Sequence, residues 1–247
     1  MTPIITVLIS GSGSNLQALI DKEAKNELNG KITQVISSSA TAFGLTRAEK
    51  AGIKSKTHIL KDYYKGTTKE EKKERQIRRE QFNKDLANLI INGDDKDTNY
   101  IKPDLIVCAG WMLILSPAVL TPLEQAGITI INLHPALPGA FDGTHAIDRA
   151  WKAGQDGEIT KGGVMIHKVI AEVDRGAPIL VEEIDLKKEE TLEEYEDRVH
   201  KVEHVAIVKG TNLALDEIIE KKKTAEKKKK SDDEETLDEK IDKLKLA

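Results

Sequence analysis

Short runs rich in β-branched residues alternate along this chain with longer segments of helical periodicity. The runs fall at 4–9, 32–37, 55–59, 104–108 and 128–133. Such alternation is typical of a parallel sheet whose strands are joined by helices that cover its faces. The sequence therefore predicts an α/β fold with a doubly wound, mostly parallel sheet of the Rossmann-like kind.

Helical periodicity places the connecting helices between these runs. They are expected over 15–26, 44–51, 67–91, 117–125 and 145–153. A pair of antiparallel strands is expected next, over 164–173 and 178–186, so the sheet should carry an antiparallel C-terminal strand. A helix from Leu192 to about Glu220 would then close the domain.

The chain divides into an apolar body and a polar tail. With 247 residues and 39% hydrophobic composition, it can bury one sizeable core. We therefore expect one catalytic domain over 1–220. Residues 221–247 are almost wholly polar and cannot offset their ordering entropy by burial, so a frayed helix or disorder is expected there. The lysines of this tail are followed by an acidic block that nearly neutralises them.

Charge and cysteine content exclude several classes of protein. The net charge is −4 with interspersed signs, so no surface for nucleic acid is predicted. Cys108 is the only cysteine, which excludes an intramolecular disulfide and favours a reducing compartment, the cytoplasm. The N-terminus runs directly into an apolar strand without the features of a signal peptide, so neither export nor membrane insertion is expected.

A glycine-rich loop follows the first predicted strand, at Ser10-Gly-Ser-Gly-Ser-Asn-Leu16. Backbone N–H groups at the start of the next helix would make it an anion site, and a phosphomonoester is the sharpest ligand. It is not a dinucleotide fingerprint, because Leu16 occupies the third glycine position and no acidic residue ends the second strand. The alternative is a tight turn with Ser14 or Asn15 as the helix cap.

Three chemically active side chains follow from the fifth predicted strand onward. Asn132 and His134 lie at its carboxyl end, where ligand sites of doubly wound sheets form, and Asp174 lies forty residues further on. An amine that attacks a formamide carbon creates an oxyanion and protons that must move. Asn132 and His134 could donate to that oxyanion, while Asp174 could orient the imidazole or hold a proton-carrying water.

Each of these residues also has a structural explanation. A histidine before proline is commonly a turn residue, and Asp174-Arg-Gly176 alone is an ordinary turn. His145 and His167 raise the possibility of a metal cluster with His134. No pair of these three histidines has the i,i+4 spacing of a zinc motif and no cysteine assists, so no metal is predicted.

Four blocks together resemble the phosphoribosylglycinamide formyltransferase family, especially its fungal, monofunctional form. They are SGSGSNLQALI at 10–20, CAGWMLILSP at 108–117, NLHPALPG at 132–139 and RVHKVEH at 198–204. The resemblance extends from Ile4 to about Ile219. It implies a folate-dependent formyl transfer to glycinamide ribonucleotide in purine synthesis, with small-molecule substrates, no metal, and a monomer or homodimer.

The resemblance also implies which residues form the site. Asn132, His134 and Asp174 carry over as the catalytic residues, with 10-formyltetrahydrofolate as the formyl donor. The substrate phosphate and ribose would be held by Gly13, Ser14, Asn15 and Glu203. The folate would lie against Met112, Leu113, Ile114, Leu115, Ile170 and Val173.

Two positions depart from the family pattern. Met165 stands where bacterial members have a serine that can hold a water, and Leu113 stands where many members have a basic residue near the folate tail.

Three rival functions remain on the sequence alone. A formyltetrahydrofolate hydrolase is expected to carry an additional N-terminal domain, a methionyl-tRNA formyltransferase a basic C-terminal domain, and a nucleotide-binding module would use the glycine loop without catalysis.

Overall fold

The strands of this protein form one twisted sheet. In the computed structural model, residues 2–94 and 97–245 are described, with side chains described as far as 228. The sheet of this described part has seven strands in the order β3-β2-β1-β4-β5-β6-β7. The strands are β1 Ile4–Ile9, β2 Lys31–Ser37, β3 Lys54–Thr57, β4 Leu105–Cys108, β5 Thr129–His134, β6 Lys161–Lys168 and β7 Pro178–Asp185.

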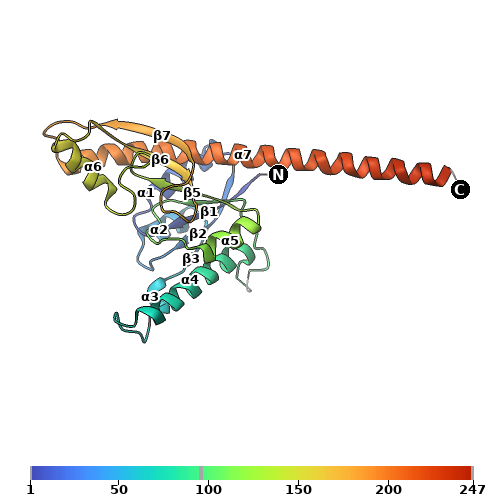
Figure 1. Cartoon of the computed structure of the whole chain (residues 1–247), viewed down its shortest axis with the longest axis horizontal. Helices are drawn as coiled ribbons and strands as arrows, with labels where there is room; N and C mark the ends of the chain where they lie inside the picture. The colour runs from blue at the N-terminus through green and yellow to red at the C-terminus, as the bar shows by residue number, and fades with distance from the viewer. Residues whose placement is uncertain (1, 95–96, 246–247) are drawn as a thin grey trace.

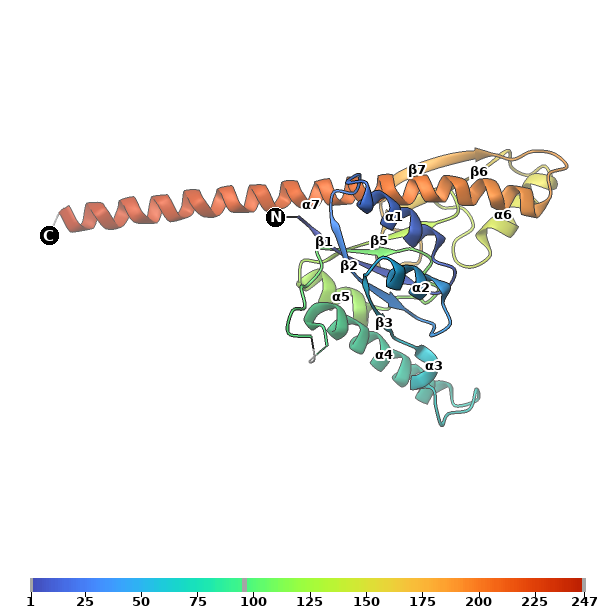
Figure 2. The same cartoon turned by 180° about the vertical axis from the view of Figure 1, so that it is seen from behind.

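The direction of the strands confirms the predicted fold class. β1 to β5 are parallel to one another, whereas β6 is antiparallel to both β5 and β7. Helices connect the strands and cover the sheet (Figures 1 and 2). They are α1 Ser14–Ala24, α2 Phe43–Lys50, α3 Leu60–Tyr63, α4 Lys72–Asn92, α5 Pro117–Gln125, α6 Ala146–Gln155 and α7 Leu192–Lys245.

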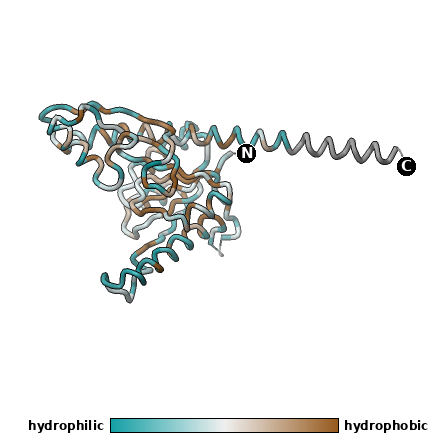
Figure 3. Tube along the Cα trace, in the orientation of Figure 1, coloured by the Kyte–Doolittle hydropathy of each residue, from teal (hydrophilic) through white to brown (hydrophobic). Residues whose placement is uncertain are grey.

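Alternating side chains give the sheet two buried faces. On one face, Val7, Val107 and Ile131 pack with α1, α2, α6 and α7, and on the other Leu8 and Ile106 pack with α4 and α5. Successive strand residues point to opposite faces, so a strand buried on both faces needs an apolar run without alternation. The hydrophobic trace therefore concentrates in the sheet, with polar segments at the periphery (Figure 3).

The structure corrects several predicted boundaries. The helix expected over 67–91 begins only at Lys72, and a single-turn helix at Leu60–Tyr63 had no sequence signal of its own. The strand expected over 164–173 runs instead from Lys161 to Lys168. β-branched residues continue beyond that strand, but they lie in a loop over 169–177, which carries Asp174.

The last helix is longer than the sequence predicted. It was expected to end near Glu220, but α7 continues to Lys245 and projects beyond the body of the molecule (Figure 1). Its buried side chains extend as far as Ile218, and Lys222 then forms an ion pair of 2.6 Å with Asp104. The tail is thus helical over its described residues. Over that same part of the chain, no helix combines the length and apolarity needed to cross a lipid bilayer.

Candidate active site

β5 places two of the predicted catalytic residues at the carboxyl edge of the sheet. Ile131 and Leu133 point into the core on one face, so Asn132 and His134 share the opposite face. His134 is buried and Asn132 is half-buried. The prediction that both residues lie at the end of the fifth strand is confirmed.

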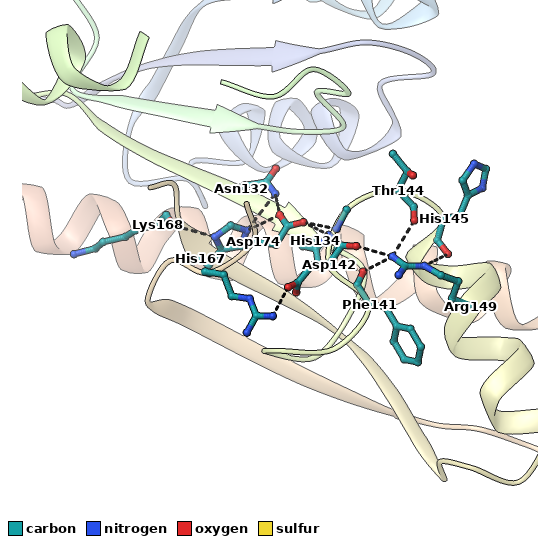
Figure 4. Close-up of polar contacts among 12 residues, drawn as sticks. Asn132, His134, Phe141, Asp142, Thr144, His145, Arg149, His167, Lys168 and Asp174 are labelled. Carbon is teal, nitrogen blue, oxygen red and sulfur yellow. Dashed lines mark hydrogen bonds and ion pairs between the residues drawn. The ribbon is translucent and has the colours of Figure 1, made fainter. Parts of the chain in front are cut away.

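The loop between β6 and β7 brings Asp174 to these two residues (Figure 4). Asp174 has φ 56°, the left-handed conformation that aspartate tolerates better than most residues. One carboxylate oxygen lies 3.5 Å from His134 Nδ1 and accepts a hydrogen bond of 2.9 Å from the Gly143 N–H. The other lies 3.5 Å from the Asn132 amide nitrogen. The predicted catalytic trio therefore forms one cluster.

His167 is a fourth member of the cluster that the sequence did not place there. It is directly opposite Asn132 in the antiparallel β5–β6 register, and its Nε2 accepts from the Asn132 amide at 3.2 Å. The same nitrogen lies 3.5 Å from Asp174. The signal that could have found it is strand pairing, since residues opposite one another on neighbouring strands share a face.

Both imidazoles are oriented by backbone carbonyl groups. His134 Nε2 donates to the carbonyl of Phe141 at 3.2 Å, and His167 Nδ1 donates to that of Lys168 at 2.9 Å. A carbonyl only accepts hydrogen bonds, so these nitrogens carry the hydrogen in a neutral ring. The nitrogen facing Asp174 is then the proton-accepting one in each ring. The cluster can therefore take up a proton beside a carboxylate that stabilises the resulting charge.

Burial and charge shift the pKa values of the cluster. Burial lowers the pKa of His134, although the charge of Asp174 partly opposes the shift. Burial disfavours the charged form of Asp174, but the hydrogen bond from the Gly143 N–H and the nearby imidazoles outweigh it and hold its pKa below the usual range. At neutral pH the arrangement is thus a carboxylate facing a neutral imidazole.

The glycine loop makes a tight contact between α1 and α2. Gly13 is the N-cap of α1 with φ 70°, and a Cβ there would lie 2.6 Å from the Cα of Gly44. The Gly44 N–H donates to the Gly11 carbonyl at 3.1 Å. The alternative interpretation of this loop, with Ser14 or Asn15 as the helix cap, is wrong. Within the described residues no side chain caps α1, so its first-turn amides stay available to a ligand.

Asn15 and Glu203 meet beside this loop from distant parts of the chain. The Asn15 amide donates to the Glu203 carboxylate at 3.3 Å, and both side chains are buried. Burial raises the pKa of Glu203. The Asn15 side-chain oxygen is buried without a hydrogen-bond partner in the described part of the chain. Such an orphaned acceptor is unusual in a folded protein and is consistent with a ligand that donates to it.

Apolar side chains are exposed on two loops beside the cluster. In the loop after β4, Met112 and Ile114 are 78% and 57% exposed, and in the loop after β6 Ile170 and Val173 are both 42% exposed. Leu113 packs against the same core cluster that supports the second loop. Leu115 differs from the other residues predicted to contact folate, because its side chain is buried in that core.

Two further expectations concern Met165 and metal ions. Met165 is buried opposite His134 in the β5–β6 register, where a thioether is only a weak hydrogen-bond acceptor. His200 and His204 on α7 have the i,i+4 spacing that the three histidines near the cluster lack. Across residues 2–94 and 97–228, however, no three His, Cys, Asp or Glu side chains are grouped as metal ligands would be.

Comparison with known proteins identifies the family. A sequence model of the formyl transferase family matches residues 4–211. The phosphoribosylglycinamide formyltransferase of Saccharomyces cerevisiae is 49% identical over 219 residues, which span 87% of this chain and 98% of the yeast protein. That of Schizosaccharomyces pombe is 48% identical over 211 residues, 85% of this chain and 95% of its own length.

Solved structures agree with the sequence comparison. The crystal structure of glycinamide ribonucleotide transformylase 1 from Symbiobacterium toebii superposes with a TM-score of 0.71 and 29% identity, covering 87% of this chain and 88% of that one. The phosphoribosylglycinamide formyltransferase from Campylobacter jejuni superposes with a TM-score of 0.68 and 30% identity, covering 85% of this chain and 96% of that one. The chain is therefore an enzyme of the formyl transferase family and belongs to its phosphoribosylglycinamide formyltransferases.

Proposed function

We propose that this enzyme transfers the formyl group of 10-formyltetrahydrofolate to the amine of 5-phosphoribosylglycinamide, through a tetrahedral intermediate stabilised by Asn132 and His134. One observation carries the proposal: an amide, an imidazole and a carboxylate converge at the end of β5, with Asp174 3.5 Å from His134 and from Asn132. These are the groups that formyl transfer to an amine requires.

The glycine loop supports a phosphorylated acceptor. The uncapped first turn of α1 presents the backbone amides of Gly13, Ser14 and Asn15 with the positive end of the helix dipole, which suits a phosphate. The Glu203 carboxylate can accept from ribose hydroxyls. The orphaned oxygen of Asn15 gives the same substrate a second acceptor. Both observations favour a ribonucleotide over water as the acceptor of the formyl group.

The two apolar loops support a folate donor. A pterin ring has flat apolar faces and a polar edge, so it needs apolar side chains above it and backbone groups at its rim. The exposed side chains of Met112, Ile114, Ile170 and Val173 can cover the ring faces. Leu113 and the backbone at Leu115 complete the first loop, and the buried Leu115 side chain holds that loop on the core.

The reaction begins when the amine nitrogen forms a bond to the formyl carbon. The π electrons of the formyl C=O move to its oxygen, and the Asn132 amide and the His134 imidazole donate hydrogen bonds to this oxyanion. In the structure both donors are held by weak contacts, at 3.2 Å for His134 Nε2 and at 3.2 and 3.5 Å for the Asn132 amide. The incoming oxygen replaces those contacts. Each such donor contributes about 2.7–4 kcal/mol.

Proton transfer completes the reaction. The attacking nitrogen loses a proton to the Asp174 carboxylate, directly or through a water. The oxyanion then re-forms C=O, the bond from carbon to N10 of the folate breaks with its electron pair, and N10 receives the proton that Asp174 had taken up, directly or through a water, which returns Asp174 to its ionised form. The products are formylglycinamide ribonucleotide and tetrahydrofolate. The low pKa of Asp174 keeps it ionised and able to accept at neutral pH.

We further propose that residues 1–220 form the catalytic domain and that 221–247 are not needed for catalysis. The described side chains of the tail from 221 to 228 are exposed. The family match ends at residue 211. The helical tail would then be an addition to the enzyme rather than a part of its site.

Folate absorbance with and without the ribonucleotide tests the proposal. The wild-type protein should produce tetrahydrofolate only when 5-phosphoribosylglycinamide is present, and His134→Ala should lower the rate by roughly a hundredfold to a thousandfold. Turnover that ignores the ribonucleotide would instead show a hydrolase. Binding of both ligands without any turnover would show a binding module.

A further inference from the structure

Arg149, on the first turn of α6, donates hydrogen bonds to the carbonyl groups of a short loop. This loop comprises residues 141–145, and we call it the Arg149-bound loop. Arg149 Nη2 donates to the carbonyls of Phe141 and Asp142 at 2.7 Å and of Thr144 at 2.9 Å. Its Nε donates to the carbonyl of His145 at 3.3 Å. One guanidinium therefore binds four of the five carbonyls in the loop (Figure 4).

The same loop holds two members of the catalytic cluster. The Phe141 carbonyl accepts from His134 Nε2, and the Gly143 N–H donates to Asp174. The Phe141 carbonyl therefore has two donors, Arg149 at 2.7 Å and His134 at 3.2 Å. The charged Arg149 is the stronger donor and holds the carbonyl in place. The contact from His134 is weaker, so the imidazole can donate to a substrate oxygen instead of to this carbonyl.

The backbone of the loop needs such a support. Phe141 and His145 both have positive φ, at 53° and 57°. L side chains rarely adopt this conformation, and it persists where surrounding contacts over-determine it. Loop carbonyls turned toward one point would also repel one another without a cation between them. Arg149 supplies both the contacts and the charge.

We propose that Arg149 is a positioning residue for formyl transfer, which sets His134 and Asp174 by holding the Arg149-bound loop. This inference rests on the proposed function. Arginine suits the task because its planar fork donates in several directions at once, whereas lysine is a point charge on a flexible stem. Lysine at this position should therefore leave most of the loop carbonyls without their donor.

Steady-state kinetics of four proteins test the proposal: wild type, Arg149→Ala, Arg149→Lys and Lys152→Ala. Lys152 is the matched control, an exposed cation of α6 whose ammonium has no hydrogen bond or ion pair in the described structure. Arg149→Ala should lower kcat by about 10- to 100-fold, since small displacements of catalytic groups have effects of that order. KM for the ribonucleotide should change by less than about twofold, and Lys152→Ala should match wild type.

A double-mutant cycle separates positioning from general structural support. In an Asp174→Ala background, Arg149→Ala should lower kcat by a clearly smaller factor than it does in the wild-type background, because one of the two groups it positions is gone and only the effect on His134 remains. An undiminished loss in that background would overturn the proposal, as would wild-type kcat in Arg149→Ala. If the alanine variant does not fold, Arg149→Lys is judged by the same criteria. A wild-type protein without ribonucleotide-dependent transfer would refute the proposed function itself.

Discussion

Replacing Gly13 by alanine should destabilise the protein and weaken the ribonucleotide site. Gly13 has a left-handed backbone conformation, and it lies in close contact with Gly44. Its φ of 70° costs a non-glycine residue roughly 1–2 kcal/mol. The new Cβ would lie 2.6 Å from Gly44 Cα, well inside the contact distance of about 3.5 Å. α2 must therefore move by about 1 Å, and such overpacking costs typically 1–3 kcal/mol. The total is about 2–5 kcal/mol.

Gly52→Ala is the matched control for this prediction. Gly52 has almost the same φ, 69°, but a Cβ there meets no atom within 4 Å. Gly52→Ala should lower the free energy of unfolding by only roughly 1–2 kcal/mol, the cost of the conformational strain. The change in the unfolded chain is the same for both substitutions, so it cancels in the comparison. The difference between the two variants isolates the contact between α1 and α2, at about 1–3 kcal/mol.

Urea denaturation followed by circular dichroism measures both free energies of unfolding. The kinetic counterpart is KM for the ribonucleotide. Loss of one or two hydrogen bonds to a charged phosphate, each about 1.5–3 kcal/mol, should raise it by at least about tenfold in Gly13→Ala and leave it unchanged in Gly52→Ala. Equal stabilities and equal KM values in the two variants would refute the reasoning, because the loop would then tolerate the displaced backbone.

Three further predictions follow from the site and the tail. Asp174→Asn should lower kcat by roughly a hundredfold while changing ribonucleotide affinity by less than about threefold; equal losses in both would show that the carboxylate serves binding instead. Deleting residues 221–247 should leave kcat and KM unchanged, and a large fall in turnover would show that the tail supports the site. Burial holds the pKa of His134 below its ordinary value of 6.5, so the unfolded chain binds more protons than the folded one as pH falls below that value. The free energy of unfolding should therefore decrease from pH 6.5 downward, and His134→Asn should show a shallower decrease in urea denaturation at each pH; an unchanged slope would mean that His134 has the same pKa in the folded and unfolded chain.

Local sequence patterns were sufficient to predict the sheet and the residues at its edge. The apolar run before Asn132 identified a buried strand, and buried parallel strands end where ligand sites form, so Asn132 and His134 were placed correctly. The bounds predicted for α5, near Pro117 to Gln125, agree with those in the structure. Strand and helix patterns of this kind depend on residues only a few positions apart in the sequence.

Features that depend on distant pairing could not be predicted from such patterns. His167 joins the cluster only because β6 pairs with β5 in one antiparallel register, and the strand end at Lys168 was obscured by the β-branched residues that follow it. Arg149 acts through backbone carbonyls, which carry no signature in the sequence. Gly13 became the helix cap in place of Ser14 or Asn15 because the close approach of α2 requires a residue without a side chain.

The most direct test of the account is single-turnover formyl transfer by Asn132→Ala, with the affinities for both substrates measured on the same protein. If the Asn132 amide serves the oxyanion, the rate of the chemical step should fall by roughly a hundredfold to a thousandfold while both dissociation constants stay within about threefold of wild type. A variant that loses affinity in proportion to its rate, or one that keeps the wild-type rate, would contradict the account, because the amide would then not act selectively in the transition state.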